Sequence, residues 1–391
     1  MKKTSEVNFF DNPNWYMLKV LLSAFGGWPY QKASTSRTIK RAVLFVFLLS
    51  TLLPLIFKVY KEWKDLHVVL VCGSQILMHA GTLTNAIYCF LNLDKTRKLL
   101  SEIREIWNLN LSKNEFKYFN YFANNTRKIT ETYIIGLYIM TFFCLTYITV
   151  PTILNILLPL NVSRTTIYPY EHEYLFIDNI KYENYILING WISTFIQITV
   201  IVAFDCCYSQ LIYFNCSWFY VVGIRMKNLT TIGDLKFENK TILFINCIRE
   251  HIKALEFADS LQTIYATPLF LLLIYNTVII SMTGCNIIYH IDDNEEVIRF
   301  ICFVVSQFFH LFFLSWHGEK LIEYSGFIFD FIYEMKWYDV PKNASKFIIL
   351  ILIRSSKPST LKAHILVVSL ETFAMISKTA LSYFTALSSF K

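Results

Sequence analysis

The sequence is poor in charged residues. Asp, Glu, Lys and Arg make up 17% of its 391 residues, against about 25% in an average soluble domain. The stretches 66–93, 133–160 and 261–289 contain none of the four. Each is longer than the roughly 20 apolar residues that a helix needs to cross a bilayer. This scarcity of charge argues against a soluble domain and predicts an all-α membrane protein.

Motifs of catalysis and of metal binding are missing too. The sequence has no GxxxxGK[ST], HExxH, GxSxG or paired CxxC pattern, and its eight histidines are dispersed. His310 and His317 share a helix face, but a pair at this spacing needs a third ligand to hold a metal. The nine cysteines show no paired spacing in the predicted outer loops. We therefore expect no enzyme, no cofactor, no metal and no disulfide framework.

What the sequence does contain is a series of long apolar stretches, each a predicted transmembrane helix. No apolar segment of the signal-peptide kind precedes the first one, so residues 1–41 are expected to form a leader. Trp15 to Leu22 in this leader should form a short amphipathic helix at the membrane surface, which Gly26 to Pro29 would end. The seven stretches are 42–57, 66–93, 133–160, 185–212, 261–289, 300–317 and 364–387.

The basic residues predict the orientation of these helices. Residues 1–41 and every second gap after them (94–132, 213–260 and 318–363) hold 28 of the 36 Lys and Arg residues, and the alternate gaps hold 7. Basic segments stay in the cytosol. The chain should therefore start inside, cross seven times and end outside, which is opposite to a G-protein-coupled receptor.

The same division separates net charge by side. The inner gaps sum to +11 and the outer gaps to −3, although the whole chain carries +7. The inner charge is explained by topology and contact with anionic lipid, so no nucleic-acid partner is expected. The outer acidic residues either keep the loops soluble or raise the local cation concentration. Among the N-x-[ST] sequons, only Asn161 would face outward and could carry glycan.

Apolar periodicity continues into the inner gaps. Leu99, Ile103 and Ile106 keep helical spacing, and Phe244 and Ile248 begin a second such series. Helices two to six are therefore predicted to project into the cytosol and to pack there on partner chains. On the other side, the run 168–174 in the largest outer loop is a candidate lid.

Three charged residues fall inside the apolar stretches. Charge is costly in lipid and is therefore a sign of function. Asp205 hydrogen-bonds to a neighbouring helix, extends toward the cytosolic surface, or has a functional role. Glu371 and Lys378 are about 10 Å apart along a helix axis, too far for direct pairing, and both would be tolerated on the wall of a water-filled pore.

The last part of the chain carries the most specific sequence signal. Residues 370–391 resemble the final helix of an insect odorant receptor, as do Gly318 to Leu321, Trp337-Tyr338, and 354–358 leading to 361–363. The Gly26 to Pro29 run resembles the family's N-terminal pattern. Related gustatory receptors usually have Gln where this chain has Ser389, which favours the odorant branch.

The resemblance implies a function. Family members are seven-helix subunits of tetrameric ligand-gated cation channels, in which a variable odorant-binding subunit joins a shared co-receptor (Orco). The chain lacks the co-receptor's long insertion before helix five and so resembles an odorant-binding subunit. It would bind a small volatile molecule in the plasma membrane of an olfactory neuron dendrite. The implied regions are a leader (1–41), helices 1–6 with the ligand pocket (42–317), a cytosolic anchor (318–363) and a pore helix (364–391).

The resemblance also implies site residues. The pore constriction would fall near Ala386, Ser389 and Phe390. Tyr383 and Thr379 come earlier in the same helix, on the face of Ala386. The odorant pocket of the family lies in the outer halves of helices two to six. The candidate ligand-binding residues there are Ser74, Met78, Tyr147, Trp191, Thr194, Phe195, Tyr275, Met282, Phe303 and Gln307.

The sequence argues against two other classes of membrane protein. A metabotropic seven-helix chemoreceptor would need its N-terminus outside, and the chain has neither Asp-Arg-Tyr after the third stretch nor Asn-Pro-x-x-Tyr in the seventh. A transporter would show inverted repeats and broken helices, which the sequence does not contain. A gustatory-type channel remains the nearer alternative.

Overall fold

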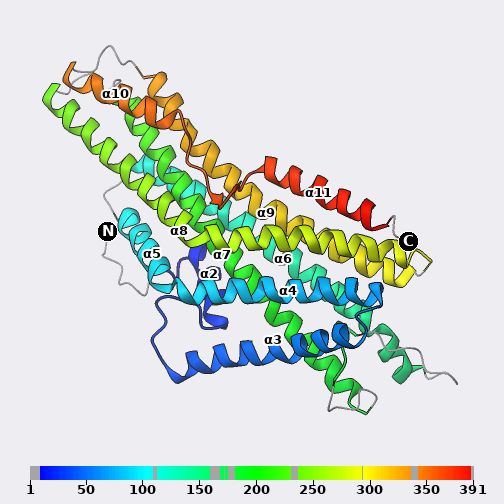
Figure 1. Ribbon diagram of the computed structural model, residues 1–391. Coiled ribbons are helices and arrows are strands. Elements are labelled where there is room, and N and C mark those ends of the chain that lie inside the picture. Colours follow the sequence, from blue (N-terminus) through cyan, green and yellow to red (C-terminus); the bar gives the residue numbers. More distant parts are fainter. Residues whose placement is uncertain are drawn as a thin grey trace.

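The computed structural model describes residues 9–108, 112–158, 168–170, 172–174, 181–229, 237–292, 294–335 and 342–388. In these ranges the chain is a bundle of long helices with one short hairpin (Figure 1). The elements are α2 (Pro13–Ala24), α3 (Thr35–Lys61), α4 (Leu66–Leu91), α5 (Leu93–Asn108), α6 (Lys113–Leu157), α7 (Glu183–Asn228), α8 (Phe237–Tyr289), α9 (Asn294–Tyr333), α10 (Lys342–Ser355), β1 (Lys362–Ala363), β2 (Leu366–Val367) and α11 (Leu370–Ser388).

Six of the described helices are long and apolar enough to cross a membrane. They are α3, α4, α6, α7, α8 and α9, and they contain most or all of the first six predicted stretches. The all-α membrane fold is therefore confirmed. The seventh stretch corresponds to α11, which has 19 residues and includes Glu371 and Lys378. This helix is not one of the six, so its crossing of the membrane stays a prediction.

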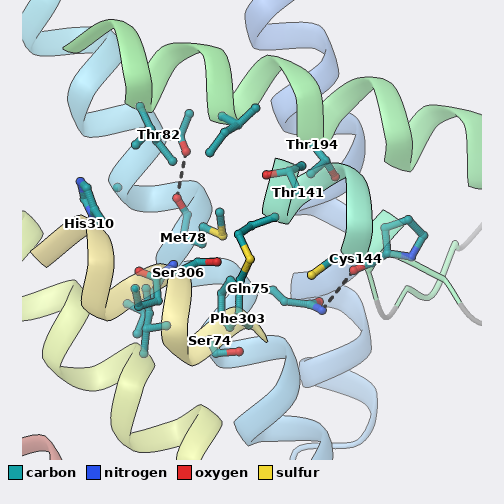
Figure 2. Close-up of a pocket in the computed structure, with 18 of the residues that line it drawn as sticks. Ser74, Gln75, Met78, Thr82, Thr141, Cys144, Thr194, Phe303, Ser306 and His310 are labelled. Carbon is teal, nitrogen blue, oxygen red and sulfur yellow. Dashed lines mark hydrogen bonds between the residues drawn. The ribbon is translucent and has the colours of Figure 1, made fainter. Parts of the chain in front are cut away.

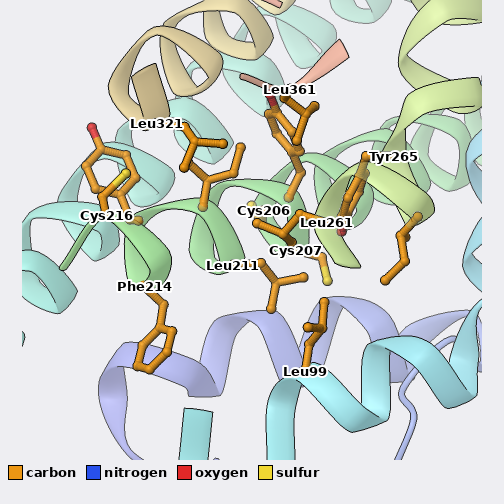
Figure 3. Close-up of a cluster of buried hydrophobic side chains, with 14 of the residues drawn as sticks. Leu99, Cys206, Cys207, Leu211, Phe214, Cys216, Leu261, Tyr265, Leu321 and Leu361 are labelled. Carbon is orange, nitrogen blue, oxygen red and sulfur yellow. The ribbon is translucent and has the colours of Figure 1, made fainter. Parts of the chain in front are cut away.

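The central helix of the bundle is α7. Almost every residue from Val200 to Phe219 on it is buried, on all faces. A helix that is apolar all round must be covered on every side, and α2, α3, α4, α6, α8 and α9 supply that cover. Figure 3 shows part of this core, where Leu211 of α7 lies near Leu99 of α5 and Leu261 of α8.

Helix α2 differs from its prediction. Trp15, Leu18, Leu21 and Leu22 are buried, and the Gln210 side chain of α7 donates to the Asn14 carbonyl at 3.2 Å. The helix thus packs its apolar face on the bundle rather than resting only on a membrane surface. It ends where the sequence predicts, because Gly26 adopts a positive φ of 77°, a conformation that glycine reaches without steric cost.

Four of the five helices predicted to extend past the length of a membrane span do so, whereas α4 ends at Leu91 and the periodic residues Leu99 and Ile103 lie on the separate helix α5. α6, α7, α8 and α9 have 45, 46, 53 and 40 residues. The bundle narrows toward α10, at the end opposite the turns that join α3 to α4 and α8 to α9 (Figure 1). There Arg225 of α7 forms an ion pair with Glu115 of α6.

The hairpin before α11 differs from the continuous helix predicted from residue 364. β1 and β2 pair antiparallel over two residues each, and α11 begins only at Leu370. Its first turn is capped because the Ser369 hydroxyl accepts from the Thr372 backbone at 3.3 Å and Glu319 accepts from the Leu370 backbone at 3.1 Å. Glu319 lies on α9, so the start of α11 is held to that helix.

Candidate functional site

A cavity in the described part of the chain lies between five helices. α4, α6, α7, α8 and α9 surround a space of about 180 Å³, together with Pro169 and Tyr170 of the connection before α7. Its wall is mostly aliphatic, aromatic and methionine side chains. An apolar cavity of about 150 Å³ stays dry and binds benzene in another protein. The space therefore suits a small, mainly apolar molecule.

Polar side chains form a stripe along one wall. The polar residues Ser74, Gln75 and Thr82 follow one another on α4 with the apolar Met78 between the last two, at intervals of one, three and four residues, so all four share a helix face. Figure 2 shows this stripe opposite Thr141 and Cys144 of α6 and beside Phe303 and Ser306 of α9. A few polar groups on an apolar wall are typical of a site that orients a small ligand.

Residues 168–174, the candidate lid, return into the bundle at Tyr170. The Tyr170 hydroxyl lies 2.8 Å from the Thr194 hydroxyl and accepts from Gln197 Nε2 at 3.0 Å. Pro169 packs on Gly190, where an added Cβ would lie 3.1 Å from the proline ring. At the other end, Glu173 forms an ion pair with Lys61 at 2.5 Å, and this hydrogen bond lowers the pKa of the Glu173 carboxyl. The described residues of this segment are thus held at Tyr170 and at Glu173, and Pro169 and Tyr170 form part of the cavity wall. Its role as a lid stays a prediction.

A buried polar cluster lies behind the opposite end. The Asp205 carboxylate of α7 is fully buried and accepts from the Tyr133 hydroxyl at 2.5 Å. His310 Nε2 lies 3.2 Å from the same carboxylate, and His310 Nδ1 lies 3.4 Å from Asn276 Nδ2. His310 and Asn276 line the cavity. Asp205 of α7 is therefore hydrogen-bonded to Tyr133 of α6 and lies close to His310 of α9, which agrees with the first of its predicted roles, a hydrogen bond to a neighbouring helix.

Six of the ten candidate ligand-binding residues line this cavity: Ser74, Met78, Thr194, Tyr275, Phe303 and Gln307. They come from four helices and are brought together by the bundle. Their contact with a ligand stays a prediction, since the cavity supports it by position alone.

The other four candidates lie off the cavity wall, for two geometric reasons. Tyr147 and Phe195 are next in sequence to the lining residues Ile148 and Thr194, and one residue turns the side chain by about 100° around the helix. Tyr147 stacks on Phe143, and Phe195 lies against Trp191.

Trp191 and Met282 lie on the cavity-facing side of their helices, but too far along the helix axis to line the cavity. Each lies three residues beyond a lining residue, Thr194 on α7 and Ile279 on α8. The Met282 Cε atom fills the space beside Gly73, 2.4 Å from where a Cβ on that glycine would be. The cavity therefore ends one turn earlier than expected.

Several lining residues were not among the candidates. Thr82, Ser306 and His310 continue the helical spacing of Met78 and Phe303, so a strict i+3/i+4 extension would have found them. Tyr170 gives no such signal, because its position depends on how a loop returns between helices.

Helix α11 packs on α8 and α9 by one face. Ile376 and Ala380 are buried, the Ser281 hydroxyl donates to the Ala380 carbonyl at 3.2 Å, and Cys285 Sγ lies 3.9 Å from the Phe384 carbonyl. Of the predicted pore residues, Tyr383 and Ala386 are exposed on this helix and Thr379 is half-buried. Ser389 and Phe390, and the sequon at Asn161, lie outside the described residues.

Comparison with known families decides where this bundle belongs. The family model described as 7tm odorant receptor matches residues 70–381, a range that includes the whole cavity wall and most of α11. The chain belongs to the odorant receptor family. It therefore groups with receptors and ion channels rather than with enzymes, and it is a multi-pass membrane protein.

Sequence relatives of this odorant receptor family member are distant. Odorant receptor 67c of Drosophila melanogaster is 25% identical over 44% of this chain and 42% of that protein. Odorant receptor 9a of the same species is 27% identical over 47% of each chain. The matched region thus spans less than half the length of these relatives. Odorant receptor 13a is 23% identical over 78% of this chain and 75% of its own.

The fold is similar to a solved structure over nearly its whole length. The olfactory receptor OR5 from Machilis hrabei in complex with eugenol superposes with a TM-score of 0.82, covering 96% of this chain and 97% of that one at 14% identity. The structure of OR5 described without that ligand gives 0.79. At such low identity the likeness establishes the fold and leaves ligand and assembly to be argued from this chain.

Proposed function

We propose that this odorant receptor family member is the odorant-binding subunit of a heteromeric, ligand-gated, non-selective cation channel in olfactory signalling. It would assemble with the shared co-receptor (Orco) as a tetramer in the plasma membrane of an olfactory neuron dendrite. The observation that carries this proposal is the apolar cavity of about 180 Å³ enclosed by five helices, since such a cavity suits a small volatile molecule.

The geometry supports a route from ligand to pore. α8 presents Leu272, Tyr275, Asn276 and Ile279 to the cavity, and about one turn further along, Ser281 and Cys285 contact the backbone of α11. A ligand that fits better when α8 is displaced would also displace α11. Such a ligand shifts the population toward that state by its difference in affinity for the two states. We propose that this state has the wider pore.

The proposed orientation places the N-terminus in the cytosol. It rests on the distribution of 28 against 7 basic residues. The course of α11 supports this orientation (Figure 1). The helix runs toward the end of the bundle where α3 meets α4 and α8 meets α9, and these two turns are the predicted outer gaps 58–65 and 290–299. An epitope tag at residue 1 should be stained only after permeabilisation, and a tag at residue 391 on intact cells. Staining of the first tag on intact cells would exclude this topology.

The proposed function is tested by co-expression with the co-receptor. Cells that carry both chains should show cation current in response to members of a broad odorant panel, and cells that carry the co-receptor alone should show a different or absent response. Normal surface assembly of both chains without any odorant-evoked current would argue against the proposal.

Filling the cavity should weaken the odorant response. Ser306 lines the cavity on α9, and Ser306→Leu places a larger apolar side chain in the ligand's space. We expect the odorant concentration for half-maximal current to rise by about 5- to 150-fold, since overpacking costs about 1–3 kcal/mol. The neighbouring Val305 is 51% exposed and faces away from the cavity, so Val305→Leu is the matched control. Equal shifts for the two variants would contradict this placement of the ligand.

A bulky side chain at the proposed constriction should block conduction without affecting binding. Ala386 is exposed on α11, and Ala386→Trp would narrow a pore lined by this helix. Odorant-evoked current should fall several-fold while surface expression stays unchanged. Leu381, also exposed but on another face of α11, gives the control variant Leu381→Trp. Full current from Ala386→Trp would place the pore elsewhere.

A further inference from the structure

The cavity wall contains polar groups whose hydrogen atoms are already used. The hydroxyls of Ser74, Thr82, Thr194 and Ser306 each donate to a backbone carbonyl three or four residues earlier in their own helix, at 2.8 to 3.1 Å. A hydroxyl has one proton and two lone pairs. Toward a molecule in the cavity these four side chains therefore act as hydrogen-bond acceptors.

Two lining amides lead to the same result. Gln75 Nε2 donates to the Pro169 carbonyl at 3.4 Å, and Asn276 Nδ2 donates to the Leu272 carbonyl at 2.8 Å. A carbonyl oxygen accepts only, so these contacts determine which end of each amide is the nitrogen. The oxygens, Gln75 Oε1 and Asn276 Oδ1, are buried and receive no hydrogen bond. A buried acceptor without a donor is costly.

The negative charge of Asp205, which lies behind the cavity wall, also favours a ligand that donates a hydrogen bond. Asp205 lies 3.2 Å from His310 Nε2, and one of its carboxylate oxygens, Oδ1, receives no hydrogen bond. The Asn276 amide points a donor at His310 Nδ1, which leaves Nε2 as the protonated nitrogen facing Asp205. The negative field at this end of the cavity favours the positive end of a ligand dipole.

Few lining groups can act as donors to a ligand. Arg299 is paired with Glu296 at 2.5 Å but has further N–H groups, and the Tyr275 hydroxyl also lines the cavity, so these two residues are the donors of the wall. The Tyr170 hydroxyl accepts from Gln197, so its proton is directed to Thr194. Thr141 and Gln307 carry both donors and acceptors and therefore do not discriminate. The wall as a whole offers acceptors in excess.

We infer that the preferred ligand is a hydrogen-bond donor, an alcohol or phenol with an otherwise apolar body, whose hydroxyl is received by Asn276 Oδ1 or Gln75 Oε1. A ketone or ether of the same size would bind less well, because it brings a further acceptor to a wall of acceptors. This inference rests on the proposed function for the identity of the site, and it adds the chemical class of the ligand.

The test uses three probes with matched size: 1-octanol, 2-octanone and heptyl methyl ether. Binding is measured as ligand-induced thermal stabilisation of the purified full-length chain, with no channel current required. We expect 1-octanol to act at a concentration about tenfold lower than the other two, the ratio expected for one buried hydrogen bond. Equal or tighter binding of the ketone or ether, or no stabilisation by any of the three, would overturn the inference.

Variants identify the acceptor. Asn276→Leu and Gln75→Met remove one amide oxygen each at similar side-chain size, and the preference for 1-octanol should fall below about twofold in at least one of them. Gln75→Met keeps the test informative if Asn276→Leu does not fold. Phe303→Leu, a change in the apolar wall, should weaken all three probes alike. Retention of the full preference in both amide variants would contradict the inference.

This measurement is independent of the channel proposal. Selective binding of 1-octanol without odorant-evoked current in co-expressing cells would retain the ligand class and exclude the channel. Current evoked equally by the alcohol, ketone and ether would retain the channel and exclude the ligand class.

Discussion

Replacement of Asp205 by Ala is expected to remove most of the folded protein from the cell surface. The carboxylate is fully buried, and it is the acceptor for Tyr133, whose side chain is 1% exposed, and the neighbour of His310 at 3.2 Å. Each buried donor left without an acceptor costs about 1–3 kcal/mol. This loss at Tyr133 is a substantial part of the roughly 5–15 kcal/mol by which a protein is stable. Surface labelling and thermal unfolding of the solubilised chain measure the effect.

The control for this prediction keeps the acceptor and removes the charge. Asp205→Asn retains an oxygen for the Tyr133 hydroxyl, so its loss of stability should be about 1–2 kcal/mol, well below that of Asp205→Ala. Tyr133→Phe removes the donor instead and should also destabilise, because it leaves a buried carboxylate with one hydrogen bond fewer. An unfolding temperature for Asp205→Ala equal to that of the unmodified chain would show that the cluster has no structural role.

The second large effect is expected at Gly318 on α9. A Cβ at this position would lie 2.0 Å from the backbone oxygen of Val368 and 2.8 Å from its carbonyl carbon. These are backbone atoms of the segment between β2 and α11, so they cannot rotate away as a side chain could. Gly318→Ala should therefore push the start of α11 off α9, which costs about 1–3 kcal/mol or more. Surface labelling should fall, and odorant-evoked current should be lost in the remaining assembled receptors.

The same helix supplies the matched control. Gly326 is eight residues further along α9, and the nearest atom to an added Cβ there is Pro358 Cβ at 4.0 Å. Gly326→Ala has ordinary van der Waals contact and gains the higher helix propensity of alanine, so surface labelling and current should be unchanged. Similar losses for the two alanine variants would mean that the close approach of α9 and the hairpin is unimportant.

The sequence-based predictions agree best with the structure where the helical period alone decides the result. A helix must satisfy its own backbone within lipid, so the uncharged runs 66–93, 133–160 and 261–289 predict helices whatever their neighbours are. The same reasoning finds helical structure in the gap after the second run, because Leu99 and Ile103 keep helical spacing and are both buried, although they lie on the separate helix α5 and not on an extension of α4.

The cavity residues were predicted less well than the helices, because a cavity forms only where side chains of several helices lie at the same level of the bundle. Thr194 and Phe195 are adjacent and both suit a ligand pocket by chemistry, yet only Thr194 lines the cavity. The phase of α7 is set by its packing on six other helices, which no local pattern contains. Tyr170 is a stronger case, since hydrogen bonds to Thr194 and Gln197 determine its place.

The amino-acid sequence by itself determined the class of this protein. Scarce charge and apolar runs of membrane length predicted an all-α membrane protein, because they depend on the solvent and on the local period. The pattern of the last helix supplied the resemblance to odorant receptors, and the orientation taken from the 28-to-7 division of basic residues stays a prediction. Only the tertiary structure decided the cavity and its chemistry. It showed that the hydroxyls of Ser74 and Ser306 donate within their own helices and that Asn276 directs its nitrogen to Leu272. Whether a polar side chain offers a ligand a donor or an acceptor depends on its partner in the fold, and composition does not specify that partner.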